Sequence, residues 1–169
     1  MITFVIGGAK SGKSRFCLER ASRHQGQKLY IATAQALDGE MREKVERHKK
    51  ERSGEWATLE EPLRIAASLK RAHHGYGAIL IDCLTLWLSN LLLAQGKDID
   101  STMDEFVASL DECRTSNIFI VSNEVGLGIV PDSALSRRFR DLAGALNQKI
   151  AALADEVYLV TAGIPLKIK

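Results

Sequence analysis

The feature that most limits what this chain can fold into is the run Gly7-Gly8-Ala9-Lys10-Ser11-Gly12-Lys13-Ser14. It follows an apolar segment at residues 2–6 and precedes a helix-like segment at residues 15–23. A strand, a G-x-x-x-x-G-K-S loop and a helix, in that order, are what a phosphate-binding P-loop requires. Its glycines allow backbone N–H groups to surround an anion, and the helix N-terminus adds further donors. The run therefore predicts nucleotide binding, and the alternative is a Gly-rich turn without a ligand.

Three residues are expected to act on the phosphates and on a metal ion. Lys13 would reach the β- and γ-phosphates, and the Ser14 hydroxyl would ligate Mg²⁺. Asp82 follows the apolar segment 78–81 and has the form of a Walker B acid. One strand from the P-loop, this carboxylate would hold the same Mg²⁺ directly or through a water molecule. The alternative is a strand-terminal aspartate that caps the next helix.

Length and composition set limits on the class of protein. A chain of 169 residues is long enough for one domain with a substantial core. Its 46% hydrophobic and 26% charged residues are typical of a soluble globular protein, and no apolar stretch is long enough for a membrane span. A formal net charge of +2 gives no electrostatic argument for binding nucleic acid or an anionic membrane.

The N-terminal residues and the cysteines both favour the cytoplasm. The chain begins directly with a strand-like segment, without a basic region or a small-residue cleavage site. Cys17, Cys83 and Cys113 are odd in number and far apart. We therefore expect reduced thiols, with neither a zinc site nor a disulfide framework.

The hydrophobic pattern predicts an α/β fold. Continuous apolar strands separated by helices indicate a mostly parallel sheet covered on both faces, as in the three-layer, RecA-like fold of P-loop NTPases. Ligands of such sheets bind beyond the carboxyl ends of the strands, where the P-loop, Thr33, Asp82 and the segment after Val121 would meet. The loop 124–131, with two glycines and a proline, is a candidate for ligand contact or gating. Strands are predicted at 2–6, 28–32, 78–82, 117–121 and 156–160, helices at 15–23, 38–52, 63–72, 84–93, 102–113 and 133–154, an irregular segment at 55–62, and a short tail from 162.

A histidine in the second predicted helix is a candidate nucleophile. Met41, Val45 and His48 share one face of that helix, and nearly every other residue in it is charged. Lys44 and Arg52 place positive charge on either side of His48, which favours a neutral imidazole and attracts a triphosphate. The alternatives are a half-buried structural histidine and a solvated charged face.

Several segments together resemble one enzyme family. Asp-Cys-Leu-Thr-Leu-Trp at 82–87 and Asn-Glu-Val-Gly-Leu-Gly at 123–128 are far more specific than the P-loop alone. In their order along the chain, they are similar to the bifunctional adenosylcobinamide kinase / adenosylcobinamide-phosphate guanylyltransferase of cobalamin biosynthesis. The resemblance runs nearly end to end. The segments that carry it are 7–15, 30–34, 41–52, 56–62, 81–90, 122–131, 138–148 and 163–167.

The resemblance implies two reactions. The family phosphorylates adenosylcobinamide with ATP or GTP, and then transfers GMP from GTP through a guanylylated histidine to the cobinamide phosphate, releasing pyrophosphate. His48 matches that histidine, and the P-loop matches the triphosphate site. The resemblance also implies a homo-oligomer, a trimer in the family. Further positions that match nucleotide contacts are Ala32, Thr33, Ala34, Lys49, Lys50, Glu51, Arg52, Glu60 and Asp82.

Two other functions are compatible with the P-loop. One is a small-molecule kinase without guanylyltransferase activity, in which His48 is structural. The other is a non-catalytic nucleotide switch or assembly ATPase. No Asn-Lys-x-Asp motif for reading guanine occurs in the chain, which argues against a GTPase switch. The corrinoid substrate follows from the resemblance alone.

Overall fold

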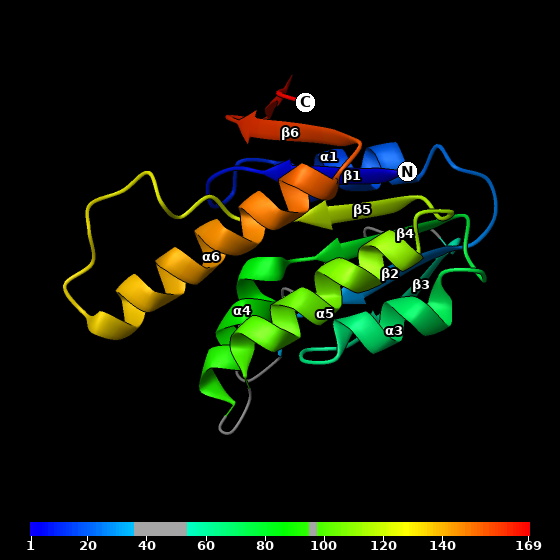
Figure 1. Ribbon diagram of the computed structural model, residues 1–169. Coiled ribbons are helices and arrows are strands. Elements are labelled where there is room, and N and C mark those ends of the chain that lie inside the picture. Colours follow the sequence, from blue (N-terminus) through cyan, green and yellow to red (C-terminus); the bar gives the residue numbers. More distant parts are fainter. Residues whose placement is uncertain (36–53, 95–97) are drawn as a thin grey trace.

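A seven-stranded sheet forms the centre of the computed structural model, which describes residues 1–35, 54–94 and 98–169. The strand order is β3-β2-β4-β5-β1-β6-β7 (Figure 1). Strands β1 to β6 pair in parallel, and β7 pairs antiparallel with β6. The strands are β1 Ile2–Ile6, β2 Lys28–Ala32, β3 Trp56–Glu60, β4 Ala78–Asp82, β5 Ile118–Val121, β6 Glu156–Thr161 and β7 Ile164–Lys167.

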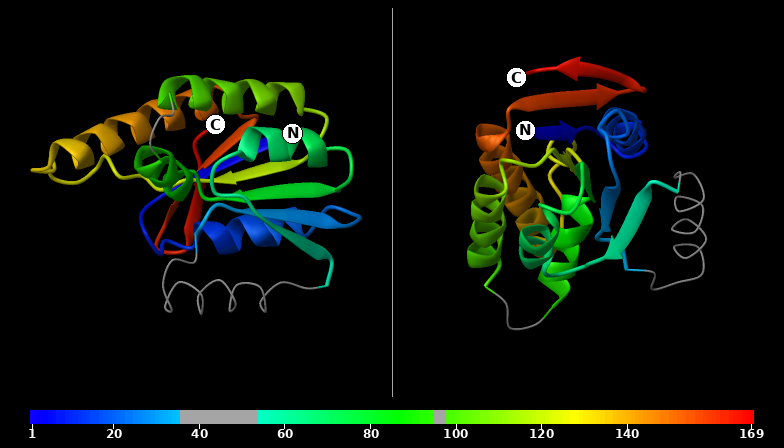
Figure 2. Two further views of the ribbon diagram at one scale, coloured as in Figure 1. Left: turned by 90° about the horizontal axis from the view of Figure 1, so that it is seen from below. Right: turned by 90° about the vertical axis from the view of Figure 1, so that its right-hand side faces the viewer.

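Helices cover both faces of the sheet, which confirms the predicted three-layer α/β architecture. Figure 2, in its right-hand view, shows α1 on one side of the sheet and α3, α4, α5 and α6 on the other. Strand β5 lies between β1 and β4, so one strand separates the P-loop strand from the strand that ends at Asp82. The helices are α1 Lys13–Ala21, α3 Ile65–Ala72, α4 Leu84–Leu93, α5 Ile99–Glu112 and α6 Ala134–Leu153.

Two hydrophobic clusters explain why the central strands are apolar on both faces. The larger cluster lies between the sheet and α3 to α6 and includes Phe4, Trp87 and Phe106. The smaller cluster lies between the sheet and α1 and includes Cys17 and Leu80. A parallel strand buried on both faces has no polar side to alternate with, so its sequence is a continuous apolar run.

Two edge strands correct the predictions made for their segments. Residues 55–62 were expected to be irregular, but Trp56–Glu60 forms β3. Residues after 162 were expected to be a tail, but Ile164–Lys167 forms β7. Each pairs with a single neighbour, β2 or β6, so most of its side chains stay partly or fully exposed. Such strands lack the long apolar run by which the buried strands are recognised.

Two helices begin earlier than predicted, each directly after its N-cap residue. Helix α5 begins at Ile99 rather than at residue 102, because the Asp98 side chain accepts a hydrogen bond from the Ser101 N–H. Helix α1 begins directly after Gly12, two residues before the predicted start. Such shifts of a few residues are common at helix ends.

Other predictions concern the cysteines, membrane spans and the second helix. The three cysteines are buried and form no disulfide, as expected. Among the helices that the structure describes, none combines the length and the apolar character needed to cross a bilayer. The predicted helix 38–52, including His48, lies outside the described residues.

Candidate functional site

The P-loop is held in shape by β6 and by the turn that follows it. Gly7 has φ 152°, and a Cβ atom there would lie 2.2 Å from the carbonyl oxygen of Val160. Gly12 has φ 101°, and a Cβ atom there would lie 3.3 Å from the Cα atom of Gly163. The Gly163 N–H also donates a 2.8 Å hydrogen bond to the Ser11 carbonyl. The two glycines are therefore required by close backbone approach as well as by their conformation.

Lys13 places a buried ammonium group over this loop. Its residue is 6% exposed, and its Nζ donates to the carbonyl oxygen of Gly8 and, at 3.4 Å, to the Ser11 hydroxyl. Burial lowers the pKa of Lys13, and the negative charge of Asp82 acts in the opposite direction. A cation in this position attracts the phosphates of a nucleotide.

The N-terminus of α1 adds backbone donors to the same place. Gly12 is the N-cap residue, so no side chain accepts from the first N–H groups of the helix. The first turn carries no acidic residue, and the earliest helical bond runs from the Phe16 N–H to the Gly12 carbonyl. The free N–H groups and the positive end of the helix dipole therefore face the loop, an arrangement that binds anions.

Asp82 ends β4 at the same edge of the sheet. Its Oδ2 accepts a 2.8 Å hydrogen bond from the Tyr30 hydroxyl on the neighbouring strand β2. The N-cap residue of α4 is Cys83, which caps through no side-chain hydrogen bond. The alternative that Asp82 caps this helix is therefore wrong. Burial, with the Asp82 charge as a second cause, raises the pKa of the Cys83 thiol to about 11, so this thiol stays protonated near neutral pH.

Thr33 fixes the backbone that follows Asp82. Its buried hydroxyl donates to the Cys83 carbonyl and accepts from the Cys83 N–H, with both distances 2.8 Å. Its own N–H donates to the Asp82 carbonyl at 3.1 Å. One hydroxyl can serve both as donor and as acceptor, so Thr33 joins the ends of β2 and β4.

Asn90 connects α4 to two strand ends. Its Nδ2 donates to the Thr33 carbonyl at 2.8 Å and to the Pro62 carbonyl at 3.1 Å. One turn earlier in α4, the Trp87 indole N–H donates to the Leu63 carbonyl at 3.0 Å. Through these bonds the motif at residues 82–90 has a structural role: Trp87 and Asn90 hold the loops after β2 and β3 in place.

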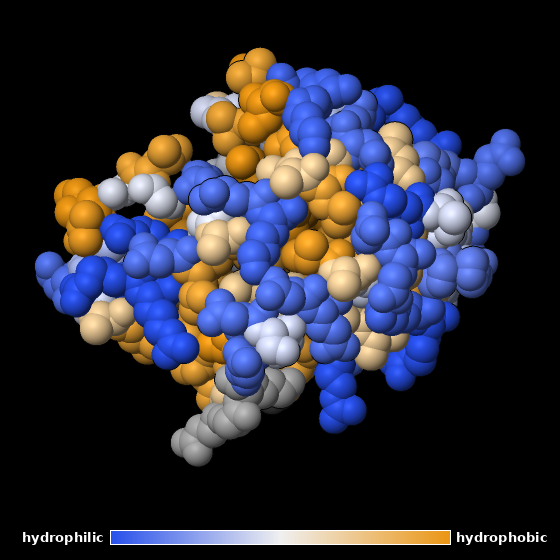
Figure 3. Space-filling view, viewed as in Figure 1, coloured by the Kyte–Doolittle hydropathy of each residue, from blue (hydrophilic) through white to orange (hydrophobic). Residues whose placement is uncertain are grey.

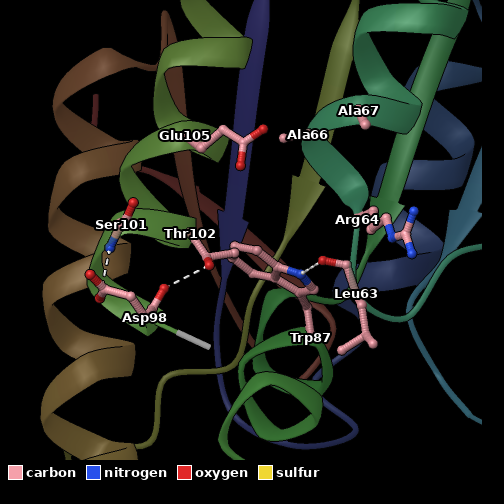
Figure 4. A pocket seen from close by; sticks show the side chains of 9 residues that line it. All are labelled: Leu63, Arg64, Ala66, Ala67, Trp87, Asp98, Ser101, Thr102 and Glu105. Atoms are coloured by element: carbon pink, nitrogen blue, oxygen red, sulfur yellow. Dashed lines mark hydrogen bonds between the residues drawn. The ribbon is translucent and has the colours of Figure 1, made fainter. Parts of the chain in front are cut away.

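Trp87 also lines a cavity of about 320 Å³ between α3, α4 and α5 (Figure 4). The cavity lies on the side of the sheet opposite α1, and none of its residues belongs to the P-loop or to the predicted nucleotide contacts. It is therefore separate from the candidate site. Its lining residues are Leu63, Arg64, Ala66, Ala67, Trp87, Asp98, Ser101, Thr102 and Glu105.

The segment after β5 contacts both the P-loop and α4. The Glu124 N–H donates to the Gly7 carbonyl at 3.0 Å, and the Asn123 N–H donates to the Thr85 hydroxyl at 2.7 Å. The predicted meeting of these strand ends at one edge is confirmed. The loop 124–131 then leads away from this edge, and most of its residues from Gly126 onward are exposed.

The structure brings most of the predicted nucleotide contacts to this edge. The register pairs Ala32 with Asp82 on one side of β2 and with Glu60 on the other, so the ends of β2, β3 and β4 are level. The predicted contacts His48 and 49–52 lie outside the described residues. Sequence reasoning assigned no role to Tyr30 or Asn90, although a buried tyrosine hydroxyl in a strand is a signal that it needs a polar partner.

Comparisons with known proteins find one family and several relatives. The sequence model of the cobinamide kinase / cobinamide phosphate guanyltransferase family matches residues 3–168. The chain is 44% identical to the bifunctional adenosylcobalamin biosynthesis protein CobP of Pseudomonas aeruginosa, with coverage of 100% of this chain and 98% of the relative. It is 40% identical to CobU of Salmonella typhimurium, named as a bifunctional adenosylcobalamin biosynthesis protein, with coverage of 100% of both chains.

A solved structure supports the fold. An ATPase from the type III secretion system of pathogenic bacteria aligns with a TM-score of 0.51 at 11% identity, covering 98% of this chain and 56% of that chain. At this identity, the likeness concerns only the fold, and it agrees with a P-loop NTPase sheet. The P-loop and the family match over nearly the whole length lead to one conclusion: the chain belongs to the cobinamide kinase / cobinamide phosphate guanyltransferase family.

Proposed function

We propose that this enzyme phosphorylates adenosylcobinamide with ATP or GTP and then transfers GMP from GTP to the product, giving adenosylcobinamide-GDP and pyrophosphate. The family match at residues 3–168, over a chain with a formed P-loop, is the observation that carries the proposal. The names of the relatives, both bifunctional proteins of adenosylcobalamin biosynthesis, support it. We assign both activities to one domain, residues 1–169, acting in the cytoplasm, where ATP and GTP are available.

Both reactions would use one triphosphate site. The α1 N-terminus and the Lys13 ammonium supply positive charge for the phosphates. Mg²⁺ prefers hard oxygen ligands, and the Ser14 hydroxyl and the Asp82 carboxylate are such ligands, so these residues fit the ion. When bound, Mg²⁺ would neutralise charge on the phosphates. Ala32, Thr33, Ala34 and Glu60 would contribute to the nucleotide site from the ends of β2 and β3.

His48 is proposed as the nucleophile of the second reaction. A neutral ring nitrogen attacks the α-phosphorus of GTP, the bond from that phosphorus to pyrophosphate breaks, and a phosphoramidate forms. A phosphate oxygen of adenosylcobinamide phosphate then attacks the same phosphorus. The N–P bond breaks and the imidazole is regenerated. Residues proposed to contact nucleotide beside His48 are Lys49, Lys50, Glu51 and Arg52.

Exposure to radiolabelled GTP tests this function directly. With α-labelled GTP, the protein is expected to retain label after free nucleotide is removed, and to lose it when adenosylcobinamide phosphate is added. With γ-labelled GTP the protein is expected to retain none, because that phosphorus leaves in pyrophosphate. Phosphorylation of adenosylcobinamide without any α-label on the protein would reduce the function to a kinase. Failure of both reactions in the purified protein would favour the alternative of a non-catalytic nucleotide switch.

We further propose that the protein is a homo-oligomer, with a trimer as the state that the family resemblance implies. The loop before α6 exposes several large apolar side chains, among them Leu127 at 88% and Ile129 at 96%. Figure 3 shows apolar atoms, in orange, on the projection at the left where Figure 1 draws this loop. Apolar side chains gathered on one projection are typical of a surface that another chain covers. Val130 and Leu135 are also exposed there.

An Ile129→Asp variant tests this surface. A carboxylate at a covered apolar contact is costly, so the variant is expected to have a lower molar mass than the wild type by light scattering after gel filtration. Leu93→Asp, at the end of α4, is the matched control because its side chain is 70% exposed elsewhere on the molecule. Equal mass for the wild type and Ile129→Asp would contradict the assignment.

A further inference from the structure

Lys13 and Asp82 carry opposite charges at the same edge of the sheet but do not pair. Asp82 is level with Val121 of β5, and Val121 is level with Val5 of β1, two residues before the P-loop begins. Among the ion pairs of the described residues, none joins them within 4.0 Å. Lys13 donates to the P-loop, and Asp82 accepts from Tyr30 on the neighbouring strand.

The position of the Tyr30 hydroxyl is set by the sheet. Side chains alternate along a strand, so Tyr30 and Ala32 share the face of the sheet that α1 covers, together with Leu80 and Asp82 of β4. The register pairs Ala32 with Asp82, so the tyrosine ring reaches the carboxylate diagonally. Tyr30 is 8% exposed, and its ring packs edge-on against Trp56 with centroids 6.4 Å apart. This packing restricts where the hydroxyl can lie.

We propose that Tyr30 is a positioning residue whose hydroxyl holds the Asp82 carboxylate toward β2 and thereby leaves the Lys13 ammonium available for the triphosphate. The inference rests on the proposed nucleotide site. Opposite charges in a partly buried site attract strongly, because water screens them less there than at the surface. Without the Tyr30 bond, the carboxylate turns to Lys13. A triphosphate then has to displace the carboxylate before it binds.

Affinity for ATP, measured by calorimetry with EDTA and again with Mg²⁺, tests this role. Tyr30→Phe keeps the ring and removes only the hydroxyl. We expect ATP affinity to fall about tenfold even in EDTA, the size of effect that one hydrogen bond to a charged group produces. Asp82→Asn removes the competing charge. In EDTA, the double variant is therefore expected to bind ATP as tightly as Asp82→Asn alone.

Tyr158→Phe is the matched control. Tyr158 is also a strand tyrosine that is 8% exposed, and its hydroxyl also contacts a carboxylate, that of Glu156 at 3.2 Å. The same hydroxyl accepts a 2.7 Å hydrogen bond from Arg20 in the last turn of α1, at the end of the helix away from the P-loop. Both contacts lie away from the residues that support the P-loop, so the ATP affinity of the control is expected to equal that of the wild type. Thermal unfolding of all four variants checks that they fold.

Three results would overturn the inference while the wild type still binds ATP. The first is an ATP affinity of Tyr30→Phe that equals that of the wild type in EDTA. The second is a loss of ATP affinity in Tyr30→Phe that is seen only when Mg²⁺ is present. The third is a double variant that binds ATP more weakly in EDTA than Asp82→Asn alone. A wild-type protein that binds neither ATP nor GTP would instead refute the proposed nucleotide site.

Discussion

Replacing Lys13 with alanine is expected to lower both the phosphorylation of adenosylcobinamide and the transfer of GMP by about a thousandfold or more. Both reactions build negative charge on phosphate oxygens, and the Lys13 ammonium is held at the P-loop by its bonds to Gly8 and Ser11. The measurement is the initial rate of each reaction at saturating nucleotide, with the two products separated chromatographically.

A control variant separates this effect from a general loss of positive charge. Arg23 is an exposed cation just beyond the far end of α1, so Arg23→Ala is expected to retain both rates within about twofold, as surface changes usually do. Because Lys13 is buried, its replacement could affect folding, and circular dichroism is used to check that Lys13→Ala is folded. A folded Lys13→Ala protein that retains either reaction within tenfold of the wild type would contradict a shared triphosphate site.

Replacing His48 with alanine is expected to abolish GMP transfer to the background level and to leave the kinase rate within about threefold of the wild type. Without the ring nitrogen no phosphoramidate forms, whereas phosphorylation of the corrinoid hydroxyl needs no protein nucleophile. Mass spectrometry of the protein after exposure to GTP measures the adduct, and peptide mapping assigns it to a residue.

His74 offers the control for this experiment. It is an exposed histidine that follows α3, so His74→Ala is expected to keep the adduct and both rates. An equal loss of kinase and transfer activity in folded His48→Ala protein would refute a dedicated nucleophile. An adduct that maps to another residue would reassign the role.

The buried part of the fold could be predicted because its signal is local. Segments such as 78–82 are apolar throughout, and that pattern has few explanations other than a strand covered on both faces. Strands β3 and β7 could not be recognised in the same way. Trp56–Glu60 and Ile164–Lys167 are strands because a neighbour offers an unpaired edge, and a short sequence does not show which neighbour it will have.

The candidate site, like the fold, could be predicted from the sequence only in its local parts. The P-loop was predictable because eight consecutive residues form it, and Asp82 because a carboxylate follows an apolar strand. The bonds that position Asp82 join residues far apart in the chain: the Thr33 hydroxyl meets Cys83 and the Tyr30 hydroxyl meets Asp82. These contacts depend on β2 lying beside β4, which no single segment encodes. The role of His48 stays a prediction.

The contact between the P-loop and β6 bears on how the protein is made. The ribosome adds residues in the order of the sequence, so it completes the P-loop long before Val160 and Gly163 exist. Those two residues supply the backbone against which Gly7 and Gly12 rest, and Gly163 holds Ser11. A nascent chain that ends before them carries the motif without its support. Formation of the nucleotide site is thereby coupled to the synthesis of β6 and of the turn that follows it, because a nascent chain without these residues lacks the backbone contacts that hold Gly7, Ser11 and Gly12.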